Sequence, residues 1–237
     1  MEPHYRLALD QALAWLTTHF APTGIVVSGS ILRGNPQPNS DFDLYVLHEQ
    51  AFRQRVQKRF NGVPCEIFVN NAAQVRAYFA SEWRGNRPVT AHLLATGQVV
   101  HGHANPQLRA LLAEALHYAT QAAPLTDEQA TFRNYGLATL FEDATDTLAT
   151  DALTCCYLLD QVVAQVVEYA FVARQRPLPR VKDRLRSLSE LEAGLGFGVQ
   201  QYYQAAGVEE KYALAKALVF QVAGAWEFFE WASTPAT

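Results

Sequence analysis

Hydrophobic and polar positions change their period part-way along the chain. Up to about residue 105, amphipathic segments alternate with short apolar and β-branched runs, a mixture typical of helices and strands within one α/β unit. Strands are predicted at 24–30, 41–47 and 63–69. Helices are predicted at 5–20, 50–60 and 72–79. We therefore expect a mixed sheet with helices over residues 1–105.

Beyond residue 105 the strand signals stop and a helical period takes over. Asn105-Pro106 opens a helix, and Thr126 with Gln129 forms a capping box for the next one. Further helices are predicted at 151–175, 180–188, 197–206 and 208–231. The fold class is therefore α+β, with a mixed-sheet domain at 1–105 followed by an all-α helical bundle domain at 106–237.

Composition restricts the possible functions more than it restricts the possible folds. The 237 residues are 49% hydrophobic and 18% charged, which is ordinary for a globular protein. A formal net charge of −4 makes nucleic acid an unexpected partner and mildly favours a cationic one. Gln, Glu and Lys interrupt the long apolar stretches, so we expect no membrane-spanning segment.

The three cysteines and the N-terminus indicate a cytoplasmic protein. No Cys-x-x-Cys pair is present, and the first helix lacks the pattern of a signal peptide. Near the C-terminus, the aromatic residues of 226–231 would pack in the bundle or form a homodimer contact.

Two aspartates at the start of a predicted strand are the first candidate chemistry. Alternation sends Asp41 and Asp43 to one face, about 7 Å apart along the strand, and such a carboxylate pair suits Mg²⁺. Gly29 allows close backbone approach, and Ser30 precedes an expected helix start whose free N–H groups favour an anion. Arg33 is a candidate phosphate contact or a surface arginine. A lone Asp-x-Asp is also common in solvated turns.

A third carboxylate interrupts a later apolar strand. Glu66 lies within 63–69, where a buried acidic side chain is costly unless it is paired or bound to metal. An edge strand that exposes Glu66 to water is the alternative. The metal interpretation predicts a site of three carboxylates, Asp41, Asp43 and Glu66.

The complete motif resembles a known superfamily. Gly29-Ser30, ten residues, Asp41-Phe42-Asp43 and a later Glu66 are similar to the polymerase-beta type nucleotidyltransferases, in the small bacterial branch of minimal nucleotidyltransferases and aminoglycoside adenylyltransferases. The resemblance covers about a third of the chain. It implies transfer of a nucleoside monophosphate from a triphosphate to a hydroxyl, with release of pyrophosphate.

The resemblance also assigns roles to residues of this chain. It implies that Asp41 and Asp43 bind Mg²⁺, with two ions during turnover, and that Glu66 is a third ligand, the general base, or both. It implies that Ser30 and Ser40 contact the terminal phosphates of ATP or another nucleoside triphosphate.

A basic turn in the helical half is a further candidate. Residues 176–183 form a proline-stiffened turn into a helix, and positive charge at a helix N-terminus opposes the dipole unless an anion binds there. The turn resembles the Pro-x-Lys-Asp turn of the adenylyltransferases, which implies that Lys182 contacts the triphosphate and that the helical domain binds the acceptor and closes the site. A solvated basic turn fits the same residues.

The segment between the two halves is a weaker candidate. Residues 79–88 concentrate Glu82, Trp83, Arg84 and Arg87, which would line the acceptor site or form a surface loop with a packed tryptophan.

Three classes of function remain. The first is an enzyme that transfers AMP to a hydroxyl of a small molecule, such as an antibiotic. The second is an antitoxin-type nucleotidyltransferase that modifies a partner protein. We do not expect the helical half to be a fused ribonuclease toxin of the associated family. The signature of that family is an Arg and a His with four to six residues between them, whereas seven residues separate Arg109 and His117. The third is a non-catalytic nucleotide-binding regulator, which the three carboxylates disfavour.

Overall fold

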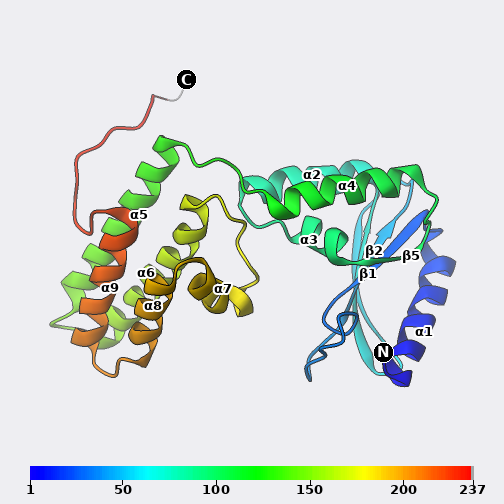
Figure 1. The fold of residues 1–237 in the computed structure, drawn as a ribbon, viewed down its shortest axis with the longest axis horizontal. Helices are drawn as coiled ribbons and strands as arrows, with labels where there is room; N and C mark the ends of the chain where they lie inside the picture. Colours follow the sequence, from blue (N-terminus) through cyan, green and yellow to red (C-terminus); the bar gives the residue numbers. More distant parts are fainter. Residues whose placement is uncertain (236–237) are drawn as a thin grey trace. The chain divides into compact units, whose positions relative to one another are not determined.

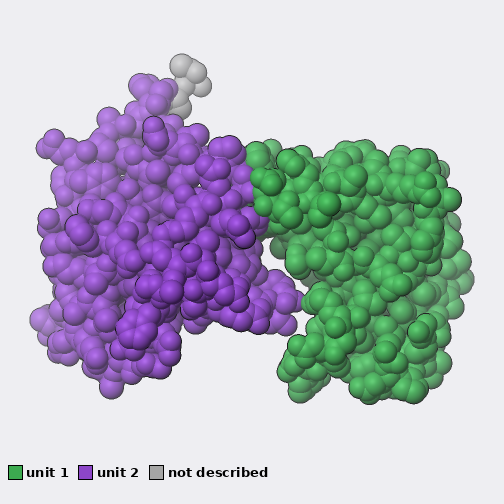
Figure 2. Space-filling model, viewed as in Figure 1, with its two compact units in different colours: residues 1–121 green, residues 122–237 purple. Residues whose placement is uncertain are grey.

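The chain forms two compact units. A computed structural model describes residues 1–235, and it divides the chain into a first unit, Met1–Gln121, and a second unit that begins at Ala122 (Figure 2). The first unit contains a mixed sheet with helices, and the second is helical (Figure 1). The α+β class is confirmed.

A five-stranded sheet organises the first unit. Its order is β3-β4-β2-β1-β5, and the β2–β4 pair is parallel while the other pairs are antiparallel. The strands are β1 Gly24–Ser28, β2 Phe42–Leu47, β3 Gln54–Phe60, β4 Val63–Asn70 and β5 Gln98–His101.

Helices cover both faces of this sheet. Helix α1, Pro3–Phe20, packs through Ala12 and Leu16 on strand residues such as Leu44. The opposite face receives α2 Ala72–Arg84, α3 Val89–Thr96 and α4 Pro106–Thr120. Because successive strand side chains point to opposite faces, each buried strand supplies both cores.

The fourth helix extends the first unit to Gln121, past the predicted domain end at residue 105. Asn105 caps α4 by accepting the N–H of Leu108, and Leu108 and Leu111 are buried in the core that α2 and α3 share. Removal of α4 would expose this apolar surface, so the helix belongs to the first unit.

Strand β3 corrects the prediction of a helix at 50–60. The segment enters a hairpin with β4 through Asn61 and Gly62, whose φ angles are 46° and 78°. Two central residues with positive φ are typical of a type I′ turn, which suits the twist of a two-residue hairpin. The helix expected from residue 31 is also wrong, because residues 30–34 form turns. Helix α3 and the short edge strand β5 were not predicted.

The second unit is a helical bundle. Its elements are α5 Asp127–Thr147, α6 Ala152–Ala173, the 3₁₀ turn Val181–Asp183, α7 Arg184–Leu191, α8 Ala193–Gln204 and α9 Val208–Ala223. Helix α9 ends before the predicted residue 231, because Gly224 adopts φ 74° and closes the helix in the left-handed conformation.

Helix α6 supplies much of the core of the second unit. Phe141 of α5 and Leu159, Val162 and Val166 of α6 are fully buried. Among the described residues, α6 is the one helix long and apolar enough to cross a membrane, and more than half of its most apolar stretch is buried inside the protein. This burial is typical of the core helix of a soluble protein.

Candidate active site

Strand register brings polar side chains into one row across the sheet. Asp43 lies opposite Ser28 of β1 on one side and Glu66 of β4 on the other, and Glu66 in turn lies opposite Gln57 of β3. Residues directly opposite one another share a face, so the row runs over four strands on the face that α2, α3 and α4 cover. The apolar neighbours Phe42 and Leu44 point to the α1 side.

Three carboxylates converge at this row. Asp41 precedes β2 and shares the face of Asp43, and ligand oxygens of Asp41, Asp43 and Glu66 all lie within 4.8 Å of one another. All three side chains are partly buried. Oxygen donors at this spacing are the ligands that Mg²⁺ prefers, so the donor set fits a hard divalent cation.

Gly29 makes this approach of backbone and carboxylates possible. Its φ is 108°, and a Cβ at this position would lie 2.7 Å from the carbonyl oxygen of Asp41. A larger residue would meet both backbone strain and a clash. The sequence predicted a glycine for close approach to a ligand, and the structure adds that the close neighbour is the Asp41 backbone.

The loop after β1 closes on itself through two serines. The hydroxyls of Ser30 and Ser40 are 2.5 Å apart, and the N–H of Gln37 donates to the Ser40 oxygen at 2.7 Å. Arg33 is exposed on the same loop. The structure thus brings the two predicted phosphate-contacting serines together beside the aspartates, on a turn instead of a helix N-terminus.

Ser28 was not singled out from the sequence. Ser28 is 2% exposed, and its hydroxyl oxygen has no hydrogen-bond partner among the residues that the structure describes. A buried polar atom without a partner is costly, so its place opposite Asp43 indicates a group completed by a bound ligand or its water.

Comparison with known proteins agrees with this geometry. Residues 9–86 match the family model of the nucleotidyltransferase domain, and this segment contains Gly29, Ser30 and the three carboxylates. The chain carries a nucleotidyltransferase domain. Such a domain supports nucleotidyl transfer as its general activity.

Solved structures extend the likeness of fold beyond the nucleotidyltransferase domain. Ten solved chains match, among them a nucleotidyltransferase-like protein from Exiguobacterium sibiricum, with 11% identity and a TM-score of 0.58. The likeness covers 91% of this chain and 74% of that one, and at this identity it shows the fold alone. No curated protein matches the sequence at a significant level.

Strand β3 of the nucleotidyltransferase domain contributes a residue that the sequence did not reveal. Arg55 forms an ion pair with Glu66, and its Nε donates to Glu66 Oε1 at 2.8 Å. Gln57 Nε2 donates to the same oxygen at 3.2 Å. The prediction of a helix at 50–60 does not place Arg55 and Gln57 beside Glu66. The Asn61-Gly62 pair that follows is nevertheless a strong hairpin signal.

Cys65 lies next to the carboxylates in the sequence but on the opposite face. Burial, with a smaller contribution from the Asp41 charge, raises the pKa of its thiol to about 12. Because the thiolate is the metal ligand and nucleophile, Cys65 remains an inert core residue at neutral pH.

Glu82 of the segment 79–88 has a structural role in the first unit. Helix α2 continues to Arg84, and Glu82 accepts hydrogen bonds from the backbone N–H and the hydroxyl of Thr90, both at 2.7 Å, at the start of α3. Burial raises the pKa of Glu82, and the hydrogen bonds from Thr90 lower it in part. Glu82 is therefore a capping residue between two helices.

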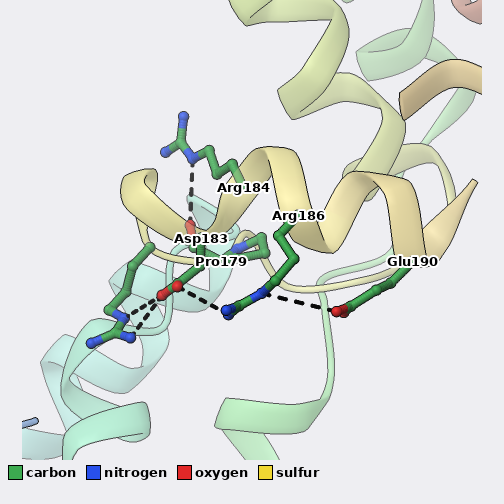
Figure 3. A network of polar contacts seen from close by, with 6 residues as sticks. Pro179, Asp183, Arg184, Arg186 and Glu190 are labelled. Atoms are coloured by element: carbon green, nitrogen blue, oxygen red, sulfur yellow. Dashed lines mark hydrogen bonds and ion pairs between the residues drawn. The ribbon is translucent and has the colours of Figure 1, made fainter. Parts of the chain in front are cut away.

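Lys182 belongs to the second unit. It is exposed in the 3₁₀ turn, while its neighbour Asp183 accepts hydrogen bonds from Arg180 at 2.8 Å and Arg186 at 3.1 Å (Figure 3). Arg184 donates to Glu168 at 2.5 Å. Ion pairs thus engage these three arginines, whereas the exposed Lys182 forms no ion pair among the described residues.

Proposed function

We propose that this chain is a Mg²⁺-dependent adenylyltransferase that moves AMP from ATP to a hydroxyl of a small-molecule acceptor. One observation carries the proposal: three carboxylates within 4.8 Å of one another beside the Gly29 turn, inside a nucleotidyltransferase domain. The buried hydroxyl of Ser28, in register with Asp43, supports a bound ligand at the same place.

The nucleotide would be held by the loop after β1. Ser30 and Ser40 offer hydroxyl donors to the terminal phosphates, and Gly29 keeps the backbone free of a side chain that would obstruct them. Arg33 would balance charge on the departing pyrophosphate. Lys182 of the second unit would add a further phosphate contact.

Asp41, Asp43 and Glu66 would hold two Mg²⁺ ions during turnover. Bound Mg²⁺ supplies charge neutralisation at the oxygens that enter and leave in an in-line displacement. The acceptor oxygen bonds to the α-phosphorus, the bond to the β-phosphate oxygen breaks, and pyrophosphate leaves. Glu66, at the end of the carboxylate row away from the serine loop, would take the hydroxyl proton, bind metal, or do both.

Charge distribution supports a cationic acceptor. The second unit contains fifteen acidic and nine basic residues, whereas the first contains eight acidic and ten basic. An acidic surface attracts cations and repels polyanions. We therefore propose a positively charged small molecule, such as an aminoglycoside-type antibiotic, as the acceptor, and the cytoplasm as the site of action.

A labelling assay tests this function. The protein is incubated with α-labelled triphosphates, Mg²⁺ and a panel of aminoglycosides, lincosamides, tRNA and cell lysate, with Asp43→Asn as the control. We expect label from ATP on a cationic small molecule and none with the variant. Label on a co-purifying protein would favour the antitoxin-type activity, and no label on any acceptor would refute the enzyme.

A further inference from the structure

Glu66 is held in place through one of its two oxygens. Arg55 donates to Oε1 through both Nε and Nη2, and Gln57 Nε2 donates to the same atom. A carboxylate oxygen has two lone pairs, so three donors occupy Oε1 fully. Oε2 is thereby left as the oxygen available to other partners.

Sheet register builds this arrangement. In the β3–β4 ladder, Gln57 lies opposite Glu66 and Arg55 lies opposite Phe68. Arg55 reaches diagonally to Glu66, while its guanidinium lies 5.0 Å from the centre of the Phe68 ring. The Arg55 side chain is 65% exposed and Glu66 only 17%, so the contact joins a solvated cation to a partly buried carboxylate.

The ring beneath Arg55 is itself fixed. Phe68 stacks on Tyr45 with ring centroids 5.9 Å apart and an interplanar angle of 15°. Tyr45 is buried, and its hydroxyl accepts a hydrogen bond from Asn70 at 3.1 Å. A guanidinium that packs on a fixed aromatic ring loses less freedom when it binds a carboxylate than one in solvent does.

We propose that Arg55 is a positioning residue: with Gln57 it fixes Glu66 through Oε1 and presents Oε2 to the Asp41 and Asp43 pair. The guanidinium also offsets part of the repulsion among three carboxylates within 4.8 Å. The orientation of the third carboxylate is then set before metal and substrate bind. The role of Arg55 in catalysis rests on the proposed nucleotidyl transfer, whereas its effect on metal binding does not.

The test compares Arg55→Gln with Arg59→Gln. Arg59 lies on the same strand and face but donates to the backbone carbonyl of Gly62, so its loss removes an equal charge without touching Glu66. Mn²⁺ binding to the full chain is measured by electron paramagnetic resonance for each variant, alone and combined with Glu66→Ala. We expect Arg55→Gln to change the Mn²⁺ dissociation constant at least about fivefold, and Arg59→Gln less than about twofold.

The combination with Glu66→Ala separates positioning from simple charge. If Arg55 acts through Glu66, its replacement in the Glu66→Ala chain will change Mn²⁺ binding no more than Arg59→Gln does in the native chain. Equal effects of Arg55→Gln with and without Glu66, or equal effects of the two arginine variants, would overturn the proposal. A native chain that binds no Mn²⁺ would overturn it too.

Turnover and a conservative variant complete the test. At saturating nucleotide we expect Arg55→Gln to lower kcat about 10- to 100-fold, with KM for the nucleotide changed less than threefold. Arg55→Lys keeps the positive charge but lacks the two guanidinium N–H groups that donate to one oxygen, so we expect the kcat of this variant to remain lowered. If the Arg55→Gln chain does not fold, Arg55→Lys takes its place in the test. A native chain that binds Mn²⁺ but labels no acceptor would refute the proposed function, while the Mn²⁺ comparison would still decide the role of Arg55.

Discussion

The two units place their polar groups in opposite ways. In the first unit a polar row runs across the sheet, and strand register decides which side chains are neighbours: Ser28, Asp43, Glu66 and Gln57. In the second unit the helices bury an apolar core, and Arg176, Arg180 and Lys182 of the basic turn are exposed. The candidate site of the first unit therefore depends on strand register, whereas these charged residues of the second unit lie outside its core.

The largest expected effect comes from the polar row. Asp43→Asn removes the charge of a metal ligand with little change in volume, so transfer should fall more than about 1,000-fold, because metal ions supply several kcal/mol of transition-state stabilisation. The labelling assay measures the loss, and thermal unfolding should show a folded chain. Activity within tenfold of the native protein would show that the carboxylates do not form the metal site.

A core substitution in the second unit tests its contrast with the polar row of the first unit. Leu159→Ala removes a fully buried side chain of α6, and we expect a loss of about 2–5 kcal/mol in the stability of that unit. Leu153→Ala, on the same helix but 83% exposed, is the control and should cost less than about 0.5 kcal/mol. Denaturant unfolding measures both, and Mn²⁺ binding at the first unit should stay native. Loss of Mn²⁺ binding in Leu159→Ala would show that the stability of the second unit affects the carboxylate site of the first.

Gly29 tests how strictly the row depends on the backbone. Gly29→Ala should cost about 1–3 kcal/mol and impair transfer, because φ is 108° and the new Cβ would lie 2.7 Å from the Asp41 carbonyl oxygen. Gly34→Ala is a matched control: its φ is 77°, but nothing lies within 4 Å of an added Cβ. We expect a loss of about 1 kcal/mol there and native activity. Equal losses in both would attribute the Gly29 effect to strain alone.

The sequence was sufficient where a local pattern decides the structure. Alternation placed Asp41 and Asp43 on one face, and the apolar runs marked β1, β2 and β4. Strand β3 was missed because it is a polar edge strand whose residues 54–59 are mostly exposed, so it lacks the hydrophobic period of a core strand. Arg55 could not be placed for the same reason, since its contact with Glu66 depends on the pairing of two strands. The end of α9 followed from the conformation of Gly224, not from the helical period.

Lys182 is the residue of the second unit for which we predict a functional role. If the sequence prediction of a phosphate contact holds, Lys182→Ala should raise KM for the nucleotide about tenfold, because a charge-assisted hydrogen bond is lost. Lys216→Ala is the control; its ammonium group lies 3.4 Å from the centre of the Trp226 ring in the same unit. Initial-rate kinetics measures both. Equal KM values for the two variants would show that Lys182 does not contact the nucleotide and is a solvated residue of the turn.

The smallest expected effect is a pH dependence of stability in the first unit. Burial raises the pKa of Glu82 above the ordinary value of about 4.3 for a glutamic acid. Glu82 in the folded chain therefore binds a proton more readily than in the unfolded chain. Its contribution to stability declines as pH rises through its raised pKa. The free energy of unfolding of the native chain minus that of Glu82→Gln should thus fall as pH rises from the ordinary pKa of a glutamic acid, about 4.3, through the raised pKa of Glu82. A difference that rises with pH would show that the hydrogen bonds from Thr90 outweigh the burial of Glu82.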